Sequence, residues 1–364
     1  MGRSCWVVLL TVIASGCGRT PAPTPAPAPV AAPAPVAASA ALTRLSLDPT
    51  GRIWVVGLCE ASGAVWAPDG GAGHLLVADD DQNDALLEVR PEGGIDGVVR
   101  AERVQYGWKM KDLEGLALDG AGDLWMTSSG SRKSSGAFDD GRLQIARFRP
   151  GLGGGPMASL RAGEGDDLSS VRAALADPRC PGCQLADGFA TASPDAGGFN
   201  VEGLTFYQGS LLLGLRAPQT TSRQTIVLEA SPPARSGGAL AYSGALALDL
   251  GGRGVRAMET TADGAAVLVL GGPGAAPVEG DAFILYFWRP GSAAIPLGAV
   301  PEEGGAAPEA ITLDGQGRLW VLYDAGDPIK AAHGGGFECA ELAAAEPGLA
   351  RALAQRFSLD LVGL

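Results

Sequence analysis

The chain has 364 residues, 55 of them Gly and 26 Pro, and a formal net charge of −13. This negative charge, with no basic cluster beside it, disfavours nucleic acid or anionic lipid as the partner of the folded part. The many Gly and Pro, and the scarcity of long helix-period stretches, are typical of short strands joined by turns. The acidity is equally consistent with a merely soluble exported domain.

Residues 1–17 have the pattern of an export signal. Arg3 supplies a positive charge, and the apolar core at residues 5–13 is too short to span a bilayer. The following Ala-Ser-Gly-Cys is similar to a lipoprotein cleavage box in which Cys17 is lipidated, although Ala14 stands where Leu is usual. We therefore expect an exported protein held on a bacterial membrane by a lipid anchor. A plain signal peptide cleaved nearby is the alternative.

Residues 18–41 consist largely of Pro and Ala. Such a segment cannot form the hydrogen-bond ladders of helices or sheets and favours an extended spacer. The folded domain is therefore predicted over residues 42–364, which is long enough for one large β domain with a complete core. We expect this domain to lie outside the cytoplasm and to be a monomer.

A repeated pattern runs along this domain. Each copy has a Glu beside a small residue, then an apolar run, a Gly-bearing turn and a second apolar run. The Glu residues at the head of the copies are Glu60, Glu114, Glu202, Glu259 and Glu309. Most of the gaps between them fit one four-stranded propeller blade, which takes roughly 40 to 50 residues. The sequence therefore predicts an all-β fold, a β-propeller of five or six four-stranded blades.

The longest gap lies between Glu114 and Glu202 and contains a stretch rich in Gly, Ala, Asp and Ser. We interpret this stretch, at about residues 151–199, as a loop-rich insertion on blade two. Residues 42–48 and 356–363 both have the pattern of edge strands. A propeller commonly closes by completing one blade with strands from both ends of the chain, so we expect these segments to meet.

The start of an innermost strand lies near the axis of a propeller, so the five Glu would surround one mouth of the channel. One interpretation is that each Glu accepts backbone hydrogen bonds from the next blade and fixes the register of the blades, as repeated positions usually do. The other is that some of them bind a ligand or a cation. The first choices for binding are Glu60, Glu114, Glu202 and Glu309, and Glu259 is the least secure.

Crowded carboxylates are unfavourable unless a cation or an Arg compensates them. Arg216 and Arg256 lie just after or before strands of the repeat and are the candidate compensators. Asp112 and Asn200 each stand two residues before a ring Glu and could support it with oxygens or amides.

The densest acidic cluster is Asp79, Asp80 and Asp81 at the end of an apolar run. With the ring Glu these carboxylates could offer oxygen ligands to Ca²⁺, although the spacing is not that of an EF-hand. A solvated turn is the alternative. If the cluster is functional, strand alternation sends Asp79 and Asp81 to one side and Asp80 to the other. Arg132 and Lys133, in a Ser- and Gly-rich loop, could hold an anionic group.

Four Cys remain in the folded domain, and an even number in an exported chain suggests disulfides. Cys180 and Cys183 have the spacing of a redox dithiol, but they lie in a loop, which favours a local structural disulfide. Cys59 heads the first blade and Cys339 lies near the closing one, so a bridge between them could staple the ring.

Nucleophilic and zinc chemistry find little support in the sequence. It contains no G-x-S-x-G motif, and its two His, His74 and His333, lie in no recognisable motif. Two His with Cys in an oxidising compartment make a poor zinc ligand set.

Several motifs, in order, resemble a known family: CEASGAVW, LLVADDDQN, DLEGLAL, FNVEGL, LLLGLRAP, LDLGGRGVRAM, FILYFW and PEAITLD. They are similar to the bacterial family called domain of unknown function 3616 and cover most of residues 59–324. The resemblance implies a β-propeller without established activity, similar at a distance to exported phytase-like and esterase-like propellers. Met258-Glu259 departs from the family pattern, and the Cys180–Cys183 insertion is not part of it.

Two functions are therefore predicted. The first is an exported, lipid-anchored propeller whose channel mouth binds a small molecule, a cation or a protein partner without turnover. The second is a divalent-metal-dependent hydrolase of phosphate esters or lactones, in which the Glu residues hold the cation and a metal-bound water attacks. The fold permits both. The cofactor is unknown from the sequence, with Ca²⁺ as the candidate.

Overall fold

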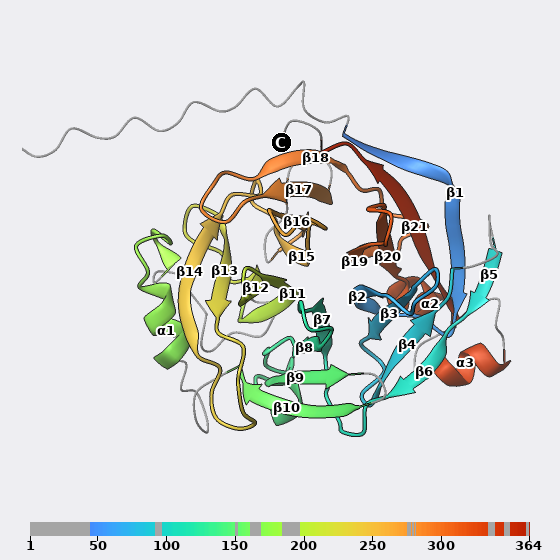
Figure 1. The fold of residues 1–364 in the computed structure, drawn as a ribbon, viewed down its shortest axis with the longest axis horizontal. Helices are drawn as coiled ribbons and strands as arrows, with labels where there is room; N and C mark the ends of the chain where they lie inside the picture. Colours follow the sequence, from blue (N-terminus) through green and yellow to red (C-terminus); the bar gives the residue numbers. More distant parts are fainter. Residues whose placement is uncertain are drawn as a thin grey trace, which may run out of the picture. The chain divides into compact units, whose positions relative to one another are not determined.

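The computed structural model describes residues 44–91, 97–149, 152–160, 169–183, 197–274, 278, 280, 282–333, 339–345, 350–361 and 364. Within these residues five β-sheets surround a common axis as a five-bladed β-propeller (Figure 1). The predicted all-β propeller is therefore confirmed, and the number of blades in the described residues is five.

In blades one to four, sequence order is also the order from the axis outward. Blade one contains β2 (Ala61–Ala67), β3 (His74–Asp79), β4 (Ala85–Val89) and β6 (Glu102–Gln105). Blade two contains β7 (Leu113–Leu118), β8 (Leu124–Ser128), β9 (Gln144–Arg149) and β10 (Gly153–Ser159). Blade three contains β11 (Asn200–Tyr207), β12 (Ser210–Ala217), β13 (Thr225–Ala230) and β14 (Tyr242–Leu248). Blade four contains β15 (Gly254–Thr260), β16 (Val267–Gly272), β17 (Ile284–Trp288) and β18 (Ile295–Ala299).

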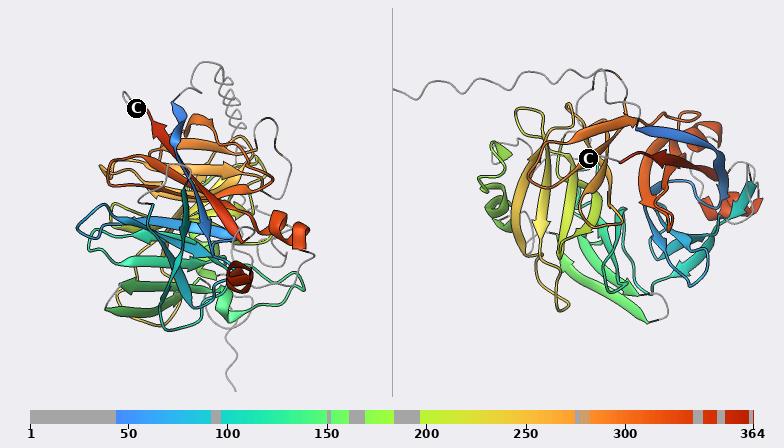
Figure 2. Two further views of the ribbon diagram at one scale, coloured as in Figure 1. Left: turned by 90° about the vertical axis from the view of Figure 1, so that its right-hand side faces the viewer. Right: turned by 45° about the horizontal axis from the view of Figure 1, so that its top comes forward.

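Blade five joins the two ends of the domain. Its strands are β19 (Ala307–Leu313), β20 (Leu319–Asp324), β21 (Arg351–Leu359) and β1 (Leu45–Val56), with β5 (Gly97–Arg100) added in parallel outside β1. β1 and β21 pair antiparallel, with Leu45 opposite Leu359 (Figure 2). The expectation that the end segments meet agrees with this pairing. The extra strand β5 has no counterpart in the sequence-based prediction.

The innermost strands β2, β7, β11, β15 and β19 contact one another in sequence around the axis, and β19 closes the circle on β2. Between blades, both faces of a strand are covered, so central strands are almost continuously apolar. All six residues of β16, for example, are buried. This packing holds the starts of the five inner strands at one end of the axis.

The predicted insertion at 151–199 contains one strand of the ring, because β10 is the outer strand of blade two. The excursion therefore lies between β10 and β11, and its helix α1 (Ser169–Leu175) packs against β14. The remaining helical segments are η1 (Asp140–Arg142), α2 (Gly326–His333) and α3 (Cys339–Ala345). No helix in the described ranges is long and apolar enough to cross a membrane.

Both candidate disulfides are present: Cys59 is bonded to Cys339, and Cys180 to Cys183. The first joins the residue just before the first inner strand to the start of α3, across 280 positions of sequence. It therefore ties blade one to blade five where the ring closes.

Candidate ligand-binding site at the channel mouth

Every inner strand has a β-bulge near its start, where one residue is skipped in the pairing with the next strand. We call the skipped residues the bulge ring; they are Ser62, Glu114, Glu202, Arg256 and Glu309. A bulge re-aims a side chain, and bulges are common next to functional sites. All five side chains of the ring line a single cavity of about 340 Å³ at the mouth of the channel.

The small residue after each ring position is explained by the close approach of neighbouring blades. A Cβ atom on Gly63 would lie 3.2 Å from the Cα of Gly115. A Cβ on Gly115 would lie 2.7 Å from the Cβ of Leu204. The bulge therefore presents a polar side chain to the cavity, and the next position must be small to let the blades meet.

Two of the five predicted ring Glu lie outside the bulge ring. Glu60 stands two residues before Ser62; it still lines the cavity and forms an ion pair with Lys330 of α2. Glu259 lies beyond Arg256 toward the other end of β15 and is not a lining residue. Its carboxyl accepts hydrogen bonds from Thr312 Oγ1 at 3.3 Å and the Leu313 amide at 3.4 Å, which links blades four and five.

Burial raises the pKa of Glu259 to about 8, so its carboxyl is largely protonated at neutral pH. Glu259 thus connects neighbouring blades, which is the structural role that the sequence analysis considered for all five Glu residues.

One side of the cavity is a compensated charge cluster around Arg256. Its Nη1 lies 2.9 Å from Glu202 Oε2, and its Nη2 contacts Glu309 Oε1. Glu202 Oε1 also accepts hydrogen bonds from Arg216 Nη1 at 2.9 Å and from Asn200 Nδ2 at 2.8 Å. Both suggested compensators, and Asn200 of the two suggested supports, are thus in contact with Glu202.

The other side of the cavity carries carboxyls that lack such partners. Within the described residues, the Glu114 and Asp80 carboxyls make no hydrogen bond or ion pair. Burial, followed by the negative charges of Glu202, Asp112 and Asp80, raises the pKa of Glu114 well above its usual range. Burial, with Asp112 and Glu60, raises the pKa of Asp80 to about 8. Burial is also the main cause that raises the pKa of Asp324 to about 6.

Asp112 supports this side from behind the cavity. Its Oδ2 accepts hydrogen bonds from the hydroxyls of Ser129 and Ser131, the latter at 3.0 Å, and lies 3.0 Å from Arg142 Nη1. Its φ of 55° lies in the left-handed region, which is uncommon for a residue other than Gly. Backbone strain of this kind clusters at functional sites, and here it lies two residues before Glu114.

The acidic cluster that follows β3 divides between two roles. Asp79 is buried and accepts hydrogen bonds from the amides of Cys59 at 2.9 Å, Glu60 at 3.3 Å and Asp81 at 3.1 Å, so it fixes the start of blade one. Burial raises the pKa of Asp79 to about 7. Asp80 lines the cavity, whereas Asp81 is not among its lining residues. The structure thus turns Asp80, but not Asp79, toward the mouth.

The basic loop suggested as an anion site lies elsewhere. Arg132 donates to the Gly136 carbonyl at 2.8 Å and covers the ring of Phe138 at 3.7 Å. Lys133 forms an ion pair with Asp139 at 2.9 Å. Neither lines the mouth cavity. His74 is also remote from it, beside Asp69 at 3.6 Å.

Three polar residues of the cavity were missed by sequence reasoning: Ser62, Asp324 and Asp327. Ser62 donates its hydroxyl to the Leu113 carbonyl of blade two. The Gly that follows Ser62, as Gly115 follows Glu114, was the signal that could have identified it.

Similar folds occur among solved structures. A gluconolactonase from Xanthomonas campestris is 15% identical, with 74% of this chain and 76% of that chain covered and a TM-score of 0.37. A PQQ-bound aldose sugar dehydrogenase from Streptomyces coelicolor is 14% identical, with 87% and 98% covered and a TM-score of 0.40. No curated protein matches the sequence. The sequence model of the family described as "Protein of unknown function (DUF3616)" matches residues 182–294. This match confirms the resemblance of the chain to that family.

Proposed function

We propose that this protein is an exported, lipid-anchored β-propeller that binds a positively charged ligand at its channel mouth. The observation that carries the binding proposal is the bulge ring, because five blades each present one side chain to the same cavity. Cys17 and the spacer at residues 18–41 lie outside the described residues, so the anchor rests on the sequence motif.

The charge of the ligand follows from the balance at the mouth. The lining residues include Arg216 and Arg256 as cations and seven carboxylates, namely Glu60, Asp80, Glu114, Glu202, Glu309, Asp324 and Asp327. Both Arg already contact Glu202. A cation beside Glu114 and Asp80 would relieve their mutual repulsion and lower their raised pKa values. Binding at neutral pH should therefore release protons.

The donor set favours an amine over a dedicated metal site. Carboxylate oxygens suit Ca²⁺, but Ca²⁺ takes about 6 to 8 oxygen ligands. The described part of the chain contains no group of three or more His, Cys, Asp or Glu placed to hold a metal ion. Glu202 and Glu309 are already in contact with Arg256. An organic ammonium group needs only one or two carboxylates, which Glu114 and Asp80 offer.

The test is calorimetric titration of the full chain with putrescine and, separately, with CaCl₂. We expect putrescine to bind with proton release and the Glu114→Gln variant to bind at least about tenfold more weakly, because hydrogen bonds to charged groups contribute about 1.5–3 kcal/mol. Glu88→Gln is the matched control, since Glu88 pairs with Arg90 at 2.6 Å and does not line the cavity. Binding of Ca²⁺ alone would reassign the mouth to a metal, and heat from neither titrant would refute the proposal.

The anchor is tested by Cys17→Ala, with Cys5→Ala in the same signal as the control. We expect the first variant to leave the membrane fraction or to remain unprocessed and the second to behave as the wild type. Unchanged fractionation and processing of Cys17→Ala would contradict the anchor.

The hydrolase predicted as the alternative keeps one supporting observation. Burial raises the pKa of Glu114 and so favours the protonated carboxyl, which is the form that a general acid requires. Turnover of phosphoester or lactone substrates that chelator abolishes and Glu114→Gln reduces would favour the enzyme over the binding protein. Equal turnover rates in Glu114→Gln and the wild type would show that Glu114 takes no part in catalysis.

A further inference from the structure

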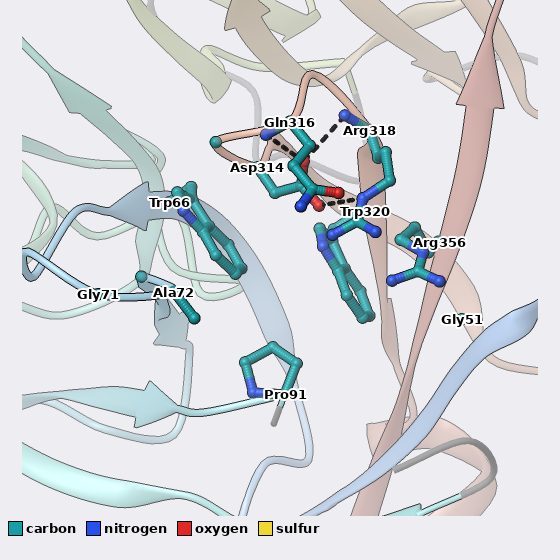
Figure 3. A pocket seen from close by; sticks show the side chains of 12 residues that line it. Gly51, Trp66, Gly71, Ala72, Pro91, Asp314, Gln316, Arg318, Trp320 and Arg356 are labelled. Carbon is teal, nitrogen blue, oxygen red and sulfur yellow. Dashed lines mark hydrogen bonds and ion pairs between the residues drawn. The ribbon is translucent and has the colours of Figure 1, made fainter. Parts of the chain in front are cut away.

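A second cavity lies at the opposite ends of the inner strands, between blades one and five. It has a volume of about 350 Å³ and is bordered by the β2–β3 and β19–β20 turns (Figure 3). We call it the indole pocket, after two of its lining residues, Trp66 and Trp320. None of its lining residues borders the mouth cavity.

The two indoles come from different blades, Trp66 from the end of β2 and Trp320 from β20. Figure 3 shows them on either side of the pocket, with Pro91 beside the gap. Trp320 is only 3% exposed, yet its Nε1 is buried and has no hydrogen-bond partner in the described structure. A buried donor without an acceptor is unfavourable, so the pocket favours a guest that supplies an acceptor.

The polar groups of the pocket are held in place by contacts outside the gap. Asp314 accepts from the amides of Gln316 at 2.9 Å and Arg318 at 3.0 Å, and from Arg318 Nε at 2.7 Å. Arg356 donates to Asp48 at 2.7 Å. Each guanidinium thus has its own carboxylate, and the pocket carries no surplus charge.

Hydrogen-bond donors remain available toward the gap. The Gln316 side-chain amide and the terminal nitrogens of Arg318 have no partner within the described ranges, and both residues line the pocket. Together with Trp320 Nε1 they form a neutral, donor-rich wall next to two aromatic faces.

We propose that the indole pocket binds a saccharide. The C–H face of a pyranose ring is apolar with slightly positive hydrogens, and it stacks on the negative face of an indole. The hydroxyl and ring oxygens of the sugar accept hydrogen bonds from Trp320 Nε1, Arg318 and Gln316. The absence of surplus charge favours a neutral sugar, and the volume lies at the lower end of the roughly 300–1,000 Å³ of small-molecule sites.

The test begins with the full chain on a glycan array of neutral and acidic sugars, followed by titration of the strongest glycan. We expect Trp66→Ala to weaken binding at least about tenfold, because the change removes both the apolar area that the sugar buries and the stacking contact itself. Trp320→Phe keeps an aromatic face but removes the N–H, and should weaken binding about three- to tenfold. Trp54→Ala, a partly buried Trp of β1 outside the pocket, is the matched control.

An array without a bound glycan overturns the proposal, and so does a glycan that Trp66→Ala and Trp320→Phe bind as the wild type does. Loss of glycan binding in Glu114→Gln with retention in both Trp variants would assign the sugar to the mouth instead. Because the two cavities share no lining residue, failure of the saccharide proposal leaves the cation proposal untouched, and the reverse also holds.

Discussion

Carboxylates recur at both ends of the inner strands, and their surroundings differ. At the turn end, Asp69, Asp119 and Asp314 each accept hydrogen bonds from the amides two and four residues later. At the mouth, Glu114 and Asp80 line a cavity, and their carboxyl groups accept no hydrogen bond from the described backbone. A repeated acid is therefore architectural where it caps its own turn. A repeated acidic residue is a candidate for function where a β-bulge directs its side chain into a cavity and away from the hydrogen bonds of the sheet.

The pKa values follow the same division. The hydrogen bond from Arg90, then those from Gly71 and Gly73, hold the pKa of Asp69 well below its usual range. Burial and neighbouring negative charge do the opposite to Glu114. The turn end is thus stabilised by ionised carboxylates, and the mouth is destabilised by them.

The largest expected contrast comes from removing one cation at each end. Arg256→Met leaves Glu202 and Glu309 without their shared buried partner, which should lower the free energy of unfolding by about 3–5 kcal/mol. Arg90→Met breaks an exposed, solvent-screened pair with Asp69 and should cost much less. Urea unfolding at pH 8 measures both. Equal losses of stability would show that the buried ion pairs of Arg256 contribute no more than the exposed pair of Arg90.

Removal of the Cys59–Cys339 disulfide should have the next largest effect on stability. Replacing Cys59 and Cys339 together by Ala should lower the free energy of unfolding by about 2–5 kcal/mol, because the bridge closes a very long loop. The paired replacement of Cys180 and Cys183 by Ala removes a loop of only a few residues and should cost clearly less. A thermal melt without reductant compares them, and the reverse ranking would count against the staple.

Removing one carboxylate from each end sharpens the contrast further. Asp119→Ala deprives the amides of Ala121 and Asp123 and the indole Nε1 of Trp125 of their acceptor, at a cost of about 1–3 kcal/mol. Glu114→Gln removes a charge that the fold disfavours, so it should leave stability at pH 8 unchanged or increase it. Denaturant midpoints decide this, and a large loss in Glu114→Gln would reveal a structural role at the mouth.

The smallest expected effect is a shift of a few degrees in the melting temperature with pH. The native state binds more protons than the unfolded state wherever a carboxyl pKa is raised, so stability should increase as the pH falls from about 8 to about 5. Below about pH 4 it should fall, because Asp69 and Asp139 have lowered pKa values. Glu114→Gln should flatten the upper part of this profile, and a profile as steep as that of the wild type would contradict the account.

The sequence predicted the fold well because blade length, turn residues and apolar runs are local properties. The closing of the ring could also be anticipated, since residues 42–48 and 356–363 both have an edge-strand pattern. The extra strand β5 could not, because its four residues gain strand structure only by pairing with β1.

The site was predicted in part. Glu114, Glu202, Glu309 and Arg256 belong to the bulge ring, but aligning the repeats on Glu misplaced two members. Register is set by the bulge, and a shift of one residue turns a side chain to the other face of a strand. Pairing register is a tertiary property that residue type does not encode. The indole pocket was missed for the same reason, because Trp66 and Trp320 become neighbours only when blade five meets blade one.

The antiparallel pairing of β1 with β21 also sets an order of folding. Among the described strands β1 is synthesised first and β21 last, so β1 can pair early with β5, but blade five is completed only after the strands of the other blades have left the ribosome. Such a distant contact is formed late and slowly. Until then, the two strand edges that β21 joins, one on β20 and one on β1, stay open to pairing with other chains. Under the proposed export, this delay is compatible with translocation, because the ring cannot close before β21 arrives.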